Sequence, residues 1–80
     1  MLTANKYQQN FLNWYQNTRA TIFSVAQVQD HLWIVFTVQD NEYKTQLFNA
    51  DSNGLGNTNY HPTWDEGFQC FTDRVKLYRR

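Results

Sequence analysis

The sequence is poor in cysteine, glycine, proline and net charge, and each shortage excludes a class of protein. The single cysteine, Cys70, has no partner for an intramolecular disulfide, which excludes a disulfide-stabilised scaffold and gives no sign of an oxidising compartment. Three glycines and one proline exclude a collagen-like chain. Seven basic and seven acidic side chains give a formal net charge of zero, which argues against a strongly basic nucleic-acid binder.

Long apolar runs are also missing from the chain. The longest covers residues 32–36, whereas a membrane-spanning helix needs about 20 apolar residues. The first ten residues contain one lysine and no apolar core, which differs from the pattern of a signal peptide. We therefore expect a cytoplasmic protein.

What the chain does contain is enough apolar material for one small core. Hydrophobic residues make up 41% of the sequence and aromatic residues 18%. A chain of this length buries only about 60% of the surface that its unfolded form exposes, so its stability should be modest. We expect a single domain over residues 1–80.

Apolar side chains with a helical period mark a helix near each end of the sequence. The first helix is predicted over residues 4–17, with Thr3 as its N-cap. The second is predicted from residue 64 to about residue 78. It follows a capping-box signature, in which Thr63 and Glu66 each bond to the other's backbone N–H. The apolar positions are Tyr7, Phe11, Trp14 and Tyr15 in the first helix and Trp64, Phe68, Phe71, Val75 and Tyr78 in the second.

Three strands are predicted between the helices, over residues 20–29, 32–39 and 42–49. Asp40-Asn41 forms a two-residue hairpin loop that tolerates positive φ, so Gln39 pairs with Glu42 in the second hairpin. The same register pairs Val38 with Tyr43, Phe36 with Thr45 and Ile34 with Leu47. Residues 50–62 are rich in asparagine and glycine and are predicted to be a loop.

The first strand has two alternative registers. A two-residue turn at residues 30–31 places Gln27 and Gln29 on the face of Ile34. A three-residue turn at residues 29–31 buries no glutamine, and we expect this register because it keeps one face apolar. Its predicted pairs are Val28 with Leu32, Ala26 with Ile34, Ser24 with Phe36 and Ile22 with Val38.

The predicted fold is α+β, with the order helix, three-stranded antiparallel meander, helix. The simplest packing places both helices on the sheet face that carries Leu32, Ile34 and Phe36. The alternative places one helix on each face. The first packing leaves an apolar sheet face uncovered, and contiguous apolar surface usually marks an interface. The residues predicted for that interface are Phe23, Val25, Trp33, Val35 and Phe48.

Catalytic and metal-binding patterns are not recognisable in the sequence. His31 and His61 fall in a turn and a loop, and Cys70 falls in the middle of a helix, so no metal-ligand spacing and no nucleophile–base pair can be named. Gly54 and Gly56 are not followed by the third glycine and the immediate helix start of a phosphate-binding loop, because the next helix begins only at Thr63. We expect no enzymatic activity, no cofactor and no metal.

The sequence therefore predicts a small protein-interaction module, most simply a homodimer held by aromatic anchors on the uncovered sheet face. Charge distribution gives a second hypothesis. Residues 74–80 carry a total charge of +4 and residues 1–73 a total of −4, so the C-terminal end of the second helix could contact phosphate weakly. The residues proposed for that nucleic-acid contact are Arg74, Lys76, Arg79 and Arg80.

Overall fold

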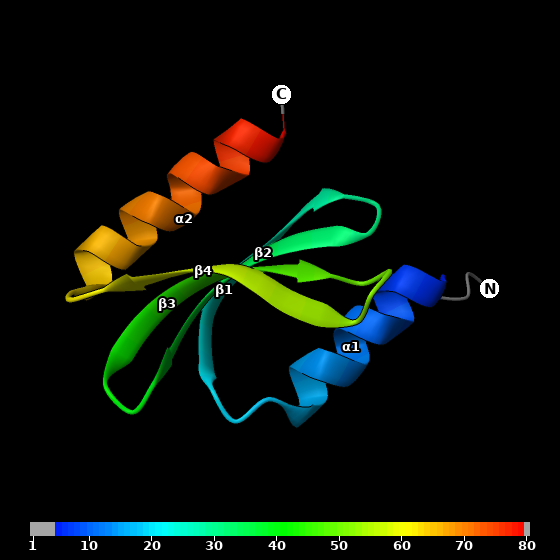
Figure 1. Cartoon of the computed structure of the whole chain (residues 1–80), viewed down its shortest axis with the longest axis horizontal. Coiled ribbons are helices and arrows are strands. Elements are labelled where there is room, and N and C mark those ends of the chain that lie inside the picture. Colours follow the sequence, from blue (N-terminus) through cyan, green and yellow to red (C-terminus); the bar gives the residue numbers. More distant parts are fainter. Residues whose placement is uncertain (1–4, 80) are drawn as a thin grey trace.

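Two helices lie on opposite faces of a four-stranded antiparallel sheet in the computed structural model, which describes residues 5–79 (Figure 1). The sheet is a meander, because its spatial order β1-β2-β3-β4 is also the order of the sequence. The elements are α1 (Lys6–Asn17), β1 (Thr21–Gln29), β2 (Leu32–Gln39), β3 (Glu42–Asn49), β4 (Gly54–His61) and α2 (Trp64–Tyr78). Within residues 5–79, neither helix is both long and apolar enough to cross a membrane.

The α+β class and the helix–meander–helix order are confirmed, but the packing of both helices on one sheet face is wrong. Helix α1 packs Phe11 against Trp33 and Phe48, on one face of the sheet. Helix α2 packs Phe71 near Ile34 and Phe36 on the other face. Strand β2 is buried on both faces from Leu32 to Thr37, so its continuous apolar run serves two cores.

The predicted loop over residues 50–62 is also wrong, because most of it forms the fourth strand. The turn before β4 is held by Asn49, whose Oδ1 accepts from the backbone N–H of Asp51 at 2.9 Å, and by Asn53 with φ of 57°. Asn57, with φ of 50°, is an extra residue in β4 at the irregularity between Thr45 and Leu47 of β3. The strand carries few apolar residues, which explains why an apolar pattern did not reveal it.

The register of the β2–β3 hairpin is confirmed along its whole length. Gln39 pairs with Glu42, and the same alignment continues to Leu32 and Asn49. Asp40 and Asn41 have φ values of 53° and 64°, as a two-residue loop with both central residues in the left-handed region requires.

The β1–β2 hairpin combines the two registers that the sequence left open. The turn has two residues, Asp30 and His31. Leu32 therefore pairs with Gln29, whereas the predicted partner of Leu32 was Val28. An irregularity between Gln27 and Gln29 then restores the predicted pairing of Ala26 with Ile34 and of Ser24 with Phe36. A second irregularity between Ile22 and Ser24 shifts the pairs again, which gives Ile22 opposite Thr37 and Thr21 opposite Val38. The bulge beside the turn thus reconciles a tight turn with an apolar face.

The capping interactions differ from the predicted ones at both helices. The predicted N-cap of α1, Thr3, lies outside the described residues. Asn5 caps this helix, with its Oδ1 accepting from the Gln8 N–H at 2.8 Å and its N–H donating to Gln8 Oε1 at 3.2 Å. At α2, Thr63 Oγ1 accepts from the Glu66 N–H at 3.2 Å, and this is the one capping-box bond present of the two predicted. The full capping box is therefore at α1.

Candidate interaction surface

Strand β1 forms one free edge of the sheet and carries no charged side chain from Thr21 to Gln29. Edge strands offer unpaired N–H and C=O groups to other chains, and natural proteins usually protect them with charged residues, prolines or bulges. In β1 the protection consists of the two bulges and of Arg79, whose guanidinium donates to the Gln27 carbonyl, and the segment from Ser24 to Gln27 between the bulges pairs regularly with β2. This segment is the most regular part of the free edge.

The five residues predicted for the interface are divided by the structure into a buried group and an exposed group. Trp33, Val35 and Phe48 lie beneath α1 with 6%, 0% and 2% of their surface exposed. They are core residues, and a charged substitution such as Trp33→Glu would test folding and not association. Phe23 and Val25 in β1 remain 42% and 40% exposed.

Phe23 lies on the other side of the sheet from the one predicted. Because of the bulge between Ile22 and Ser24, its ring packs against Phe36 on the α2 face, with centroids 5.2 Å apart. It also meets the edge of Trp64, at 6.2 Å, and Trp64 stacks on Phe68 at 4.9 Å with an interplanar angle of 10°. Phe23, Trp64 and Phe68 thus form a continuous group of aromatic rings, all partly open to solvent.

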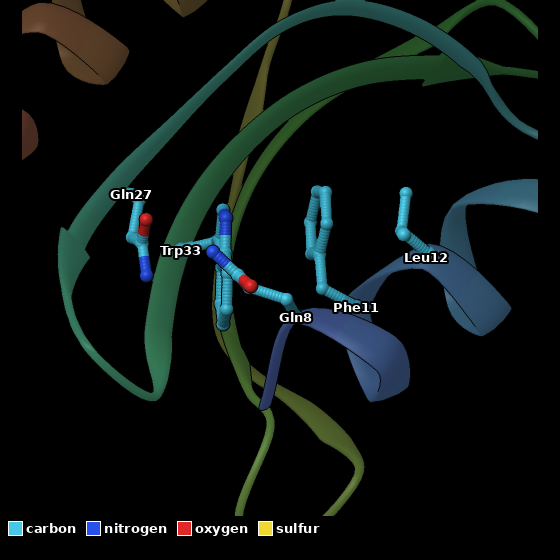
Figure 2. Close-up of a pocket in the computed structure, with 5 residues that line it drawn as sticks. All are labelled: Gln8, Phe11, Leu12, Gln27 and Trp33. Atoms are coloured by element: carbon cyan, nitrogen blue, oxygen red, sulfur yellow. The ribbon is translucent and has the colours of Figure 1, made fainter. Parts of the chain in front are cut away.

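On the α1 face, a groove separates the helix from β1. Its volume is about 270 Å³, and Figure 2 shows side chains entering it from both walls. The groove exists because α1 lies toward the other side of the sheet, where Asn10 donates from Nδ2 to the Ala50 carbonyl at 2.8 Å and Trp14 stacks on Phe48. The lining residues are Gln8, Phe11 and Leu12 from α1, and Gln27 and Trp33 from the sheet.

Exposed apolar side chains therefore gather on both faces of the sheet beside β1. Nine large hydrophobic residues within residues 5–79 are exposed: two lie in β1, two (Leu12 and Trp64) lie beside residues of β1, and two (Tyr15 and Phe68) contact Phe11 and Trp64 next to them. Tyr15 is included because it follows Leu12 by three residues on the same side of α1 and contacts Phe11. We call this set the β1-side surface; its members are Leu12, Tyr15, Phe23, Val25, Trp64 and Phe68. Two of the six, Phe23 and Val25, were predicted from the sequence as interface residues. Tyr15, Trp64 and Phe68 were placed on the apolar faces of the helices, and Leu12 was not singled out.

Two of the cations proposed for nucleic-acid contact donate hydrogen bonds within the fold. Arg74 Nη1 donates to the carbonyls of Asn57 at 2.7 Å and Thr45 at 3.2 Å. Arg79 Nη2 donates to the Gln27 carbonyl at 3.0 Å. Lys76 is exposed, and Arg80 lies outside the described residues. Nucleic-acid contact through these residues stays a prediction, to which these bonds add no support.

Cys70 and His61 are brought to the same hydroxyl group, which the sequence did not predict. Thr45 Oγ1 lies 3.3 Å from Cys70 Sγ and 3.2 Å from His61 Nε2, and Asn59 Nδ2 donates to Sγ at 3.5 Å. Thr45 is fully buried, so this network connects α2 to β3 and β4 through a desolvated hydroxyl. These contacts explain why the Cys70 thiol is half-buried, since it is part of the packing between α2 and the sheet. Within residues 5–79, no three histidine, cysteine or acidic side chains are grouped closely enough to hold a metal ion.

Comparisons with protein-family models, with curated proteins and with solved structures give no match for this chain.

Proposed function

We propose that this protein is a non-enzymatic interaction module that self-associates through the β1-side surface. The observation that carries the proposal is the concentration of exposed apolar side chains on both sides of one uncharged edge strand. Groups of exposed apolar side chains on a small protein usually mark a binding surface, and here one group lies on each face beside the same edge strand. The interface first predicted from the sequence, on the β2–β3 face, is replaced by this surface because α1 covers that face.

Aromatic residues are suited to carry the binding energy of such a surface. Each large side chain that becomes fully buried contributes about 1.5–3 kcal/mol relative to an exposed one. Phe23, Trp64 and Phe68 are already held by mutual ring contacts, so little side-chain freedom remains to be lost on binding. A few preorganised aromatic anchors are the usual basis of a stable protein interface.

Light scattering over a wide concentration range tests this proposal. We expect the 9.6 kDa chain to give a concentration-dependent dimer of twice that mass. The informative variant is Val25→Lys, which places a charge on the regular part of the β1 edge. It should weaken association by about tenfold or more, because the ammonium group would lose water in the interface. The matched control is Leu55→Lys on the opposite edge strand, since Leu55 and Val25 are 41% and 40% exposed.

The two variants distinguish an interface at β1 from an interface at β4. If Leu55→Lys dissociates the dimer and Val25→Lys does not, the interface lies on β4 and the β1-side surface is not used. A strict monomer at every concentration would rule out self-association altogether. Circular dichroism of each variant confirms that the fold is retained.

A further inference from the structure

We infer that the second copy pairs with β1 around a two-fold axis at Val25, so that two β1 strands join antiparallel in one continuous sheet. This inference rests on the proposed self-association. It adds how the two β1 strands pair and which charged residues of α2 face each other. A strand paired antiparallel with a copy of itself presents the same groups in both directions, which gives a closed dimer. β-strand addition of this type draws its affinity from main-chain hydrogen bonds along a free edge.

The backbone of β1 determines where the axis lies. The Gln27 carbonyl accepts from the Arg79 guanidinium at 3.0 Å, so it points outward from the edge of the sheet. In an antiparallel strand the N–H and C=O of one residue point the same way, and alternate residues repeat that direction. Val25 lies two residues before Gln27 within the regular segment, and it therefore also presents its N–H and C=O outward. Two Val25 residues facing each other exchange a pair of hydrogen bonds at the axis.

Pairing centred on Val25 brings opposite charges together at each end of the shared ladder. Residue 23 of one copy then lies opposite residue 27 of the other, where the bulge at Phe23 and the Arg79 bond to the Gln27 carbonyl end the ladder, so the backbone bonds of the pairing are the two at Val25. Phe23 contacts Trp64, at 6.2 Å, while Gln27 is bound by Arg79. Asp65 follows Trp64 directly in the first turn of α2, and Lys76 and Arg79 lie at the other end of this helix, so Asp65 of one copy faces the basic end of α2 in the second copy. The two-fold axis repeats this contact at the other end.

Helix α2 shows the same complementarity along its length. Its residues Asp65, Phe68, Thr72, Lys76 and Arg79 follow one another at spacings of 3, 4, 4 and 3, which places them on one flank. That flank is opposite the one on which Cys70 and Arg74 reach β3 and β4, so it lies toward β1. This flank is acidic at the N-terminal end of α2, where Asp65 lies, and basic at the C-terminal end, where Lys76 and Arg79 lie. Two α2 helices in antiparallel orientation set the acidic end of each against the basic end of the other, with Phe68 between the ends.

Charge reversal on this flank tests the arrangement. Asp65→Lys should raise the dissociation constant of the dimer by about tenfold, because both symmetric ion pairs become repulsive. The matched control is Glu66→Lys, which makes the same change in charge in the same turn of α2 but points about 100° away from the flank. It should change the constant by less than about twofold. Adding Lys76→Asp to Asp65→Lys should restore part of the affinity, since one of the two cations at the basic end is then replaced by an acid. Arg79 is left unchanged because it already holds the Gln27 carbonyl.

Hydrogen exchange of the Val25 amide tests the strand pairing directly. We expect exchange at this amide to slow in proportion to the dimer fraction as the concentration of the wild-type chain is raised. A dimer in which this amide exchanges freely, or in which Asp65→Lys and Glu66→Lys have equal effects, would overturn the two-fold arrangement. That result leaves self-association through the β1-side surface intact, provided that Val25→Lys still dissociates the dimer. A chain that is monomeric at every concentration overturns both.

Discussion

Two buried threonines show how much a single hydroxyl group depends on its partners. Thr37 and Thr45 are 1% and 0% exposed, so both hydroxyls have lost their water. Thr45 Oγ1 has Cys70 and His61 within hydrogen-bonding distance, whereas Thr37 Oγ1 has no partner among residues 5–79. A buried polar group without a partner costs free energy that an apolar group of the same shape does not.

The first prediction follows from this contrast. Thr37→Val should stabilise the protein by about 1 kcal/mol, because it removes a desolvated hydroxyl and breaks no bond. Thr45→Val, the matched control, should instead destabilise it by about 1–2 kcal/mol, since its polar neighbours lose their partner. Urea unfolding followed by circular dichroism measures both. Destabilisation by Thr37→Val would mean that its hydroxyl has a bonded partner such as an ordered water molecule.

Gly67 gives a second prediction at the scale of one residue. It lies inside α2, where alanine is ordinarily better than glycine by about 1 kcal/mol. A Cβ at this position would lie 2.5 Å from Cε1 of Phe36, whose side chain is fully buried. The ring has no free space to move into, so Gly67→Ala should destabilise the protein by about 1–3 kcal/mol through overpacking.

The measurement for Gly67 is a double-mutant cycle with Phe36→Leu. The smaller leucine side chain should relieve the contact, so that Gly67→Ala costs less in the Phe36→Leu background than in the wild type. An increase in stability on Gly67→Ala alone would show that helix propensity outweighs the close packing of α2 on the sheet.

At the scale of the elements, Arg74 attaches the least apolar strand to the rest of the fold. Its guanidinium donates to carbonyls of β3 and β4, including that of Asn57 in the β4 bulge. Strand β4 brings few apolar side chains to either core, so these charge-assisted bonds form a large part of what holds its irregular segment.

We therefore predict that Arg74→Met weakens β4 selectively. The substitution keeps the apolar part of the side chain and removes the donors, and it should cost about 1.5–3 kcal/mol of unfolding free energy. Backbone amides of β4 should exchange faster than those of β2. Lys76→Met on the exposed side of α2 is the control, measured below the concentration of association, and should change stability by less than about 0.5 kcal/mol. Uniform acceleration in all four strands would contradict a local role for Arg74.

At the scale of the whole molecule, the sequence was informative wherever a short-range rule applied. The β2–β3 register followed from the chemistry of Asp40-Asn41, and both helices followed from their apolar periodicity. The β1 bulges could not be predicted. A bulge forms where the register set by a local turn differs from the register that buries the apolar side chains, and the second of these depends on residues far away in the sequence. Strand β4 was missed because it carries few apolar residues, and because the bonds that Arg74 makes at its irregular segment come from a residue remote in sequence.

The side of the sheet on which each helix packs was equally beyond sequence reasoning. Both faces of β2 are apolar, so the pattern of residues 32–38 was compatible with helices on one face or on two. The choice depends on which arrangement buries more surface in three dimensions, and the three-residue connection at residues 18–20 does not reveal it. The candidate interface changed for this reason. Helix α1 covers Trp33 and Phe48, so the apolar side chains that remain exposed are those beside β1.

The division of the core by the sheet also separates the three tryptophans into two optical environments. Trp14 and Trp33 belong to the core between α1 and the sheet, and Trp64 lies in the aromatic group on the α2 face beside Phe23. Self-association at β1 would remove water from Trp64 and leave Trp33 as it is. Replacing Trp14 and Trp33 with phenylalanine would make the emission wavelength of Trp64 a direct reporter of the dimer, readable at concentrations far below those that scattering requires.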